Sequence, residues 1–266
     1  MGEFALPRVR FAGRDVSRML IGGNPFAGFG HRPGVPDFDR QLREYFTDEK
    51  VLETLIAAAR AGINAFHGRG DANTFRHLAN YRAWSAAQPD RPALHWLGQT
   101  APDRYVDGRP DPNIESMAEH DPMAIYVHGA TTDRLYKEGR LAELGRLVAF
   151  IKGLGLPAGI GAHSAAPLRA AETQAVGADF YILSLRSVDG EPEVCADEAD
   201  TVRAFRELPT QMVAIKVLAA GRIPPADAFA YAARHLKPND LMTVGMRDYE
   251  VEANARAATA AFVAGH

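Results

Sequence analysis

Residues 124–128 read Ala-Ile-Tyr-Val-His, and this short apolar run, which closes on His128, has two counterparts in the chain. Residues 63–67 close on His67, and residues 159–163 close on His163. Each run is followed at once by a loop that contains Gly, Ser or Thr. If the three runs are parallel strands of one barrel, their carboxyl ends share the rim at which such barrels keep their chemistry. We therefore expect the three imidazoles to meet at one site.

Strand-like and helix-like segments alternate outward from these runs along the whole chain. Eight strands are expected at residues 18–22, 61–67, 93–99, 123–128, 158–163, 180–185, 212–218 and 241–244. Amphipathic helices are expected at residues 48–61, 74–87, 114–120, 141–154, 167–176, 197–207, 224–235 and 249–264. Repeated right-handed strand–helix–strand units close most simply as an α/β (β/α)8 TIM barrel. An open doubly wound sheet is the alternative, but residues 22–28 lack the glycine-rich phosphate turn typical of that fold.

Two further segments complete the predicted architecture. Residues 8–17, with a turn at Gly13, are expected to form a short N-terminal hairpin below the barrel. The loop at residues 24–47, which contains His31, is long enough to be a lid or a substrate wall. The length of 266 residues suits one TIM-barrel domain that spans residues 1–266.

The composition argues against several classes of partner. The chain is 47% hydrophobic and 24% charged, with a net charge of −3 and no dense run of Lys and Arg. Nucleic acid and membrane surfaces are therefore not expected as partners. A cytoplasmic protein that acts on a small-molecule substrate is expected, and an oligomer is possible. The single cysteine, Cys195, excludes an internal disulfide and a site made of several thiolates.

Taken in order, several segments resemble those of the aldo-keto reductase superfamily. Residues 16–22 (VSRMLIG) and 62–67 (GINAFH) are similar to its first two strands, and the family's active-site histidine falls on His128 in residues 126–128 (YVH). Residues 160–164, 218–222 and 244–254 are similar to later segments of the family. The resemblance implies an aldo-keto-reductase-like barrel and a site for the phosphate end of NADP(H), or for a sugar phosphate, at Arg222, Gly245, Arg247, Glu252 and Asn254.

The chain departs from the family where reductase chemistry resides. His67 replaces the family's aspartate, Ala72 stands at the position of its tyrosine, and Gln99 lies near that of its lysine. Because the usual proton donor is missing, we expect a divergent barrel that has left redox chemistry and makes little use of NADP(H). The expected enzyme is a lyase or isomerase that performs acid/base isomerisation, epimerisation, dehydration or lysis on a small polyhydroxy or carbonyl compound. An NADP(H)-dependent oxidoreductase with an altered proton donor is one alternative, and a catalytically inactive binding subunit is another.

Particular residues are expected to carry this chemistry. His67 and His128 would exchange protons, while His163 would polarise an oxygen atom. Three neutral imidazoles in one funnel would also suit a divalent transition metal, although a polar pocket without metal is an open alternative. Lys216, near the end of an apolar strand, would stabilise an enolate-like charge, and it must pair with an anion or titrate at a lowered pKa. Substrate contacts are expected from loop and strand-end residues, namely Asn24, His31, Arg69, Asp71, Gln99 and Ser184.

Overall fold

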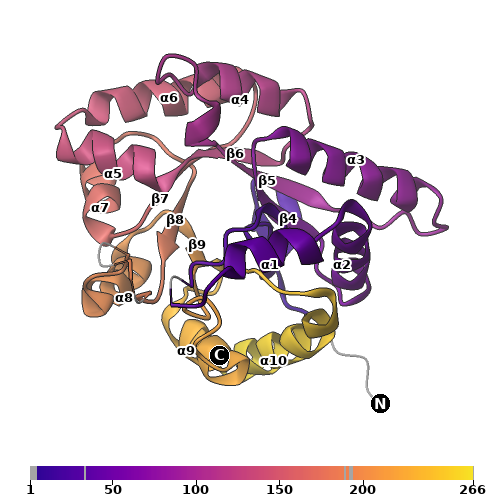
Figure 1. Cartoon of the computed structure of the whole chain (residues 1–266). Helices are drawn as coiled ribbons and strands as arrows, with labels where there is room; N and C mark the ends of the chain where they lie inside the picture. The colour runs from indigo at the N-terminus through magenta and orange to yellow at the C-terminus, as the bar shows by residue number, and fades with distance from the viewer. Residues whose placement is uncertain (1–4, 33, 189, 192–193, 266) are drawn as a thin grey trace.

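A computed structural model describes residues 5–32, 34–188, 190–191 and 194–265 and contains a closed barrel of eight parallel strands surrounded by helices (Figure 1). The strands follow one another around the barrel in chain order, and the last one pairs with the first. They are β3 (Met19–Gly22), β4 (Ala65–Arg69), β5 (His95–Gln99), β6 (Ala124–Val127), β7 (Ala158–Ala162), β8 (Phe180–Ser184), β9 (Gln211–Ile215) and β10 (Leu241–Val244). The predicted (β/α)8 architecture is confirmed, and all eight predicted strands are present with ends that shift by a few residues.

The eight predicted helices are present as well, and their ends follow local capping chemistry. Helix α2, for example, begins where the Thr47 side chain accepts a hydrogen bond from the Lys50 backbone N–H. The helices are α2 (Asp48–Arg60), α3 (Ala72–Ala86), α4 (Asp111–Ala118), α6 (Leu141–Gly153), α7 (Ala165–Thr173), α8 (Glu198–Glu207), α9 (Pro225–His235) and α10 (Val251–Ala264). Among the described residues, no helix combines the length and the apolarity that crossing a membrane requires.

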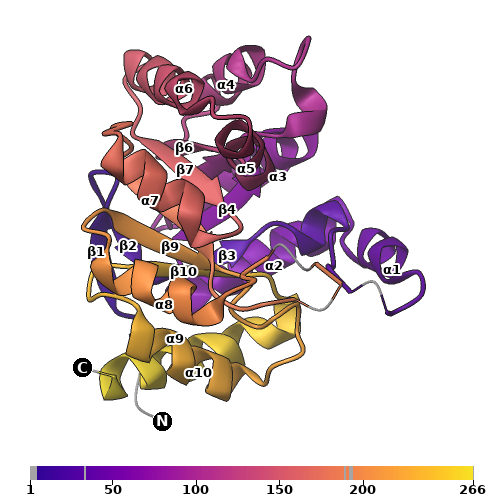
Figure 2. The same ribbon diagram turned by 90° about the vertical axis from the view of Figure 1, so that its left-hand side faces the viewer.

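Two helices were not expected from the sequence. Helix α1 (Phe38–Tyr45) lies inside the long loop that follows β3, and α5 (Gly129–Lys137) begins directly after β6. The predicted hairpin is confirmed as β1 (Arg8–Phe11) and β2 (Arg14–Ser17). Figure 2 shows this hairpin at one end of the barrel and α1 at the other. The long loop therefore lies at the end where the strands finish.

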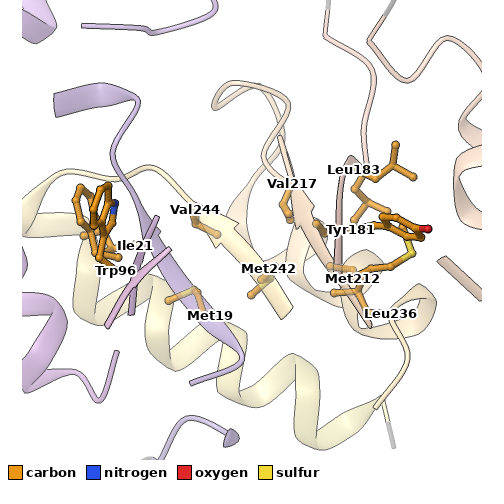
Figure 3. Close-up of a cluster of buried hydrophobic side chains, with 14 of the residues drawn as sticks. Met19, Ile21, Trp96, Tyr181, Leu183, Met212, Val217, Leu236, Met242 and Val244 are labelled. Atoms are coloured by element: carbon orange, nitrogen blue, oxygen red, sulfur yellow. The ribbon is translucent and has the colours of Figure 1, made fainter. Parts of the chain in front are cut away.

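Alternation along the strands divides the buried residues into two cores. Outward-facing residues of the strands pack against the helices, and Figure 3 shows several of them, including Met19 and Ile21 of β3 and Met242 and Val244 of β10. Inward-facing residues form a second apolar cluster, which the hairpin closes from below with Phe11. The Phe11 ring meets the Phe180 ring edge-on, with 4.9 Å between centroids.

Strand β7 has only small residues on its inner face, and this leaves room for large neighbours. A side chain at Gly161 would come within 2.8 Å of the Tyr126 ring, and one at Gly159 would come within 2.2 Å of the Phe180 ring. Both glycines therefore allow an aromatic ring from an adjacent strand to occupy the barrel interior. Toward the carboxyl ends of the strands the inward-facing residues become polar, and the candidate site begins there.

Candidate active site at the carboxyl end of the barrel

A cavity of about 760 Å³ opens at the carboxyl end of the barrel. The strand ends contribute Gln99, His128, His163 and Ile215 to its lining. One face of α5 and parts of the long loop, Phe29 and His31 among them, form its walls. The volume is within the range of small-molecule and cofactor sites. The cavity therefore lies where the strand-end histidines were expected to meet.

His128 is held in one neutral form by the start of α5. The residue caps that helix, and its Nδ1 accepts a hydrogen bond from the Ala130 backbone N–H at 3.0 Å. A backbone N–H only donates, so Nδ1 carries no proton and the neutral ring carries its proton on Nε2. Burial, together with the nearby His163 and Arg69, lowers the pKa of His128 to about 4. At neutral pH His128 is therefore a neutral hydrogen-bond donor.

His163 stands next to His128 but has a carboxylate partner. The two ring centroids are 6.1 Å apart, and His163 Nδ1 donates to Asp133 Oδ2 at 2.7 Å. The ring also lies close to the backbone of Gly129, where a side chain would come within 2.9 Å of His163 Cε1. A carboxylate on Nδ1 fixes the orientation of an imidazole and stabilises its protonated form. The sequence reading missed Asp133, because it lies on the unexpected helix α5.

His67 lies below the cavity and does not line it. Its Nδ1 is 3.2 Å from Thr243 Oγ1, and its Nε2 accepts a hydrogen bond from the Tyr126 hydroxyl at 2.7 Å. Burial lowers the pKa of His67 to about 4, with a smaller contribution from His128. The Tyr126 oxygen in turn accepts a hydrogen bond from Gln99 Nε2 at 2.6 Å. His67 is therefore part of a buried polar layer that spans the barrel.

The predicted metal triad of His67, His128 and His163 is not assembled. Among the described residues, no three His, Cys, Asp or Glu side chains are placed so that they could hold a metal ion. The physical reason is that other groups occupy the imidazole nitrogens. Both nitrogens of His67 are hydrogen-bonded inside the protein, and Nδ1 of His163 is paired with Asp133. The expectation of a divalent metal is therefore not supported.

Lys216 pairs with a carboxylate, which is one of the two outcomes that the sequence left open. Its ammonium forms a salt bridge with Glu191, whose other oxygen is 2.5 Å from His31 Nδ1. His31 Nε2 in turn lies 3.3 Å from Asn24 Nδ2, so two predicted residues of the long loop join the same cluster. Glu191 comes from a loop with no strand or helix pattern, and the sequence reading missed it for that reason.

Arg69, Asp71 and Ser184 have different surroundings. Arg69 lines the cavity and is held by salt bridges to Asp71, at 2.7 Å, and to Asp103. Asp71 does not line the cavity, because its side chain caps α3 through the Thr74 backbone N–H. Ser184 faces the barrel interior at the end of β8, and among the described residues its buried hydroxyl has no hydrogen-bond partner.

The five residues expected at a phosphate lie outside the cavity lining. Arg222 contacts the backbone oxygens of His31 and Ala219. The Arg247 backbone N–H donates to the Glu250 carboxylate, and Gly245 is exposed beside it. Glu252 pairs with Arg256, while Asn254 is buried and lies 3.8 Å from the sulfur of Met246. Gly245, Arg247, Glu252 and Asn254 lie at or just before the start of α10, whereas Arg222 lies in the loop after β9, against the backbone of His31.

Comparison with known proteins finds likeness at the level of structure. No protein-family model matches the chain, and no curated protein matches it in sequence. Among solved structures, an aldo-keto reductase from Bacillus halodurans in its holo form is 11% identical, with a TM-score of 0.63 over 96% of this chain and 90% of its own. A glycerol dehydrogenase from Gluconobacter oxydans is 12% identical, with a TM-score of 0.57 over 96% and 90%. An aldo-keto reductase from Klebsiella pneumoniae in complex with NADPH is 13% identical, with a TM-score of 0.56 over 97% and 90%.

These likenesses correct the functional expectation. The fold is aldo-keto-reductase-like, as the sequence resemblance implied. The expectation of a non-redox lyase or isomerase is wrong, because the similar structures are mostly aldo-keto reductases and dehydrogenases, and one of them holds NADPH. The absence of the family's tyrosine and lysine does not by itself exclude redox chemistry, because His128 and the Asp133-paired His163 line the cavity at the same rim.

Proposed function

We propose that this chain is an aldo-keto-reductase-type oxidoreductase that uses NADP(H) to interconvert a small carbonyl compound and its alcohol. His163, oriented by Asp133, would replace the usual tyrosine as the proton donor. The observation that carries the proposal is the hydrogen bond of 2.7 Å between His163 Nδ1 and Asp133, beside the neutral His128 in the same cavity. The second catalytic group, His128, is the position at which the sequence resembles the family's own active-site histidine.

The residues present fit the nicotinamide end of the cofactor. Ser184 supplies a buried hydroxyl without a partner among the described residues, on the strand between those that end at His163 and Ile215. An unpaired buried hydroxyl is costly, and the amide would satisfy it once binding opens a path from the cavity, whose lining does not include Ser184. Arg247, just before the start of α10, and Arg222, in the loop after β9, would hold the phosphate end of the cofactor. When bound, reduced nicotinamide supplies a hydride to the carbonyl carbon.

Residues of the chain would stabilise the negative charge on the substrate oxygen and supply its proton. As the carbonyl carbon gains a hydride, negative charge develops on the oxygen, and His128 Nε2–H would donate a hydrogen bond to it. Arg69 and Lys216 both lower the pKa of His128, so their positive charges also act at the position of the substrate oxygen beside that ring. The oxygen then takes a proton from Nε2 of protonated His163, and Asp133 stabilises that imidazolium until the transfer. Alcohol and oxidised cofactor result, and water returns the proton to His163.

Cofactor binding and turnover test the proposal directly. NADPH added to the protein should give a saturable change in nicotinamide fluorescence, and a panel of small aldehydes and ketones should cause NADPH to be consumed. His163→Gln should lower kcat about 10²- to 10³-fold, because it removes the proton donor but keeps the side chain polar. Asp133→Asn should lower it about tenfold or more, since the neutral amide supports the imidazolium less well.

Glu138→Gln is the matched control for these variants. Glu138 directly follows α5, the helix that carries Asp133, and lies at the outer wall of the cavity, where it pairs with the exposed Arg134 and Arg140. Its loss should leave kcat within about twofold, as expected for an exposed pair. Absence of NADPH binding would refute the redox function. Full activity of His163→Gln would refute the role of that histidine.

A further inference from the structure

Four polar side chains form a hydrogen-bonded row across the barrel interior, below the cavity. They come from different strands: Gln99 from β5, Tyr126 from β6, His67 from β4 and Thr243 from β10. The distances are 2.6 Å from Gln99 Nε2 to the Tyr126 hydroxyl, 2.7 Å from that hydroxyl to His67 Nε2, and 3.2 Å from His67 Nδ1 to Thr243 Oγ1. We call these four residues the polar row. Only Gln99 among them lines the cavity.

The direction of the hydrogen bonds in the polar row is consistent from end to end. Gln99 donates to the Tyr126 oxygen, so the Tyr126 hydroxyl proton is left for His67 Nε2. The neutral His67 ring then carries its own proton on Nδ1 and donates to Thr243. Burial raises the pKa of Tyr126 well above its usual value and lowers that of His67 to about 4. Neither group therefore ionises near neutral pH, and the row keeps its direction.

This arrangement leaves the oxygen of the Gln99 amide free to accept a hydrogen bond in the cavity. Its NH2 group is committed to Tyr126, and among the described residues no group donates to Gln99 Oε1. The oxygen is therefore a hydrogen-bond acceptor for a ligand. His128, which directly follows the neighbouring strand β6, is a hydrogen-bond donor, because its Nε2 carries a proton. The cavity thus offers a donor for a carbonyl oxygen and, beside it, an acceptor for a neighbouring group.

We infer that Gln99 is a specificity-determining residue that selects carbonyl substrates with a hydroxyl on the carbon next to the carbonyl. Tyr126 is its positioning residue, because it holds the amide so that the oxygen faces the cavity. A neutral hydroxyl fits this place better than an ammonium, since Arg69 and Lys216 already make the surroundings of His128 positive. A substrate without the hydroxyl would displace water from Gln99 Oε1 and give that oxygen no hydrogen bond in return, which disfavours its binding. The identification of the carbonyl partner rests on the proposed redox function.

A matched pair of ligands tests this inference by binding alone. Hydroxyacetone and butan-2-one differ by one hydroxyl in place of one methyl group. Their Kd values would be measured by NMR titration of the whole chain. The wild-type protein should bind hydroxyacetone at least about tenfold more tightly, and Gln99→Met should remove that preference because the thioether is a poor acceptor. Tyr126→Phe should reduce the preference several-fold, and Glu138→Gln should retain it.

The outcomes separate this inference from the proposed function. Equal Kd values for the two ligands in the wild-type protein, or an unchanged preference in Gln99→Met, would overturn the role of Gln99 even if both ketones are reduced with NADPH. A hydroxyl preference that disappears in Gln99→Met would support it even if neither ketone is reduced, and the redox function alone would then fail. Gln99 is only half-buried, so its variant keeps the test decisive if Tyr126→Phe does not fold.

Discussion

His128 and His163 are close neighbours, and the partner of one ring nitrogen sets a different task for each. The Ala130 backbone N–H donates to Nδ1 of His128, so that ring is neutral and offers Nε2–H. The Asp133 carboxylate accepts from Nδ1 of His163 and fixes the orientation of that ring. Two imidazoles with different partners can divide the work of polarising an oxygen and protonating it. Under the proposed function, this division would replace the work of a single tyrosine.

At the residue scale, His67 makes a prediction about pH and stability. Its pKa is about 4 in the folded protein, below the ordinary value of 6.5, so between these values the unfolded chain binds more protons. Stability is therefore fully present above the ordinary value and falls as the pH falls toward 4. His67→Asn cannot titrate, and its free energy of unfolding should drop less than that of the wild type, by about 2 kcal/mol, between pH 7 and pH 5. Urea unfolding at the two pH values measures this.

The variant also separates titration from packing. His67→Asn should cost about 2 kcal/mol at pH 7, because a buried ring and its hydrogen bonds are lost. That cost lowers the free energy of unfolding equally at every pH and does not change its dependence on pH. Parallel curves of stability against pH for the two proteins would show that His67 does not titrate as argued.

The sequence identified individual site residues better than it identified their partners. His128 and His163 could be recognised because each ends an apolar strand, and strand ends define the rim of a barrel. Asp133 and Glu191 could not, because each becomes a partner only through contacts that a loop or an unexpected helix creates. The role of His67 was also hidden, since only the barrel interior shows that Tyr126 and Thr243 occupy both of its nitrogens.

At the scale of elements, α5 shows why a helix escaped prediction. It begins with Gly-Ala-Thr-Thr, of which only Ala favours a helix, and it follows a strand without the usual capping residue. The cap is the ring of His128, whose Nδ1 accepts from the Ala130 backbone N–H. One side chain therefore begins the helix that carries Asp133 and, under the proposed function, would also form part of the catalytic pair. The pattern of apolar and polar residues could not indicate that one side chain has both roles.

The loop after β9 makes a prediction at this scale. Lys216, Ala219 and Ala220 have φ values of 56°, 45° and 56°, in the left-handed region that disfavours residues with a side chain. Ala220→Gly should relieve about 1–2 kcal/mol of strain and cost about 0.5–1 kcal/mol in chain entropy. The net result expected is a gain of up to about 1 kcal/mol in the free energy of unfolding, measured with urea.

Ala260→Gly is the matched control for that variant. Ala260 is exposed in the interior of α10, where glycine should cost about 1 kcal/mol. The same substitution should therefore act in opposite directions at the two positions. A destabilising effect of similar size at both would show that the loop after β9 carries no relievable strain.

At the scale of the whole molecule, the barrel is apolar below and polar above. Its lower interior is a cluster of apolar residues that the hairpin closes, and its upper interior contains the polar row and the histidines. The regular alternation of strands and helices made the closed barrel predictable, because few other topologies accommodate eight such units. The polar layer was not predictable as a unit, since its members are far apart in the chain and meet only when the barrel closes.

This separation predicts that the hairpin contributes to stability and not to chemistry. Phe11 is buried and packs against Phe180 below the apolar cluster, at the end of the barrel away from the cavity. Phe11→Ala should lower the free energy of unfolding by about 3–5 kcal/mol, while the folded fraction keeps its NADPH affinity. Arg10→Ala, in the same strand but exposed, should change stability by no more than about 0.5 kcal/mol. If Phe11→Ala lowers the free energy of unfolding by less than about 1 kcal/mol, the barrel closes without the hairpin. If the fully folded variant binds NADPH more weakly, the two ends of the barrel are coupled.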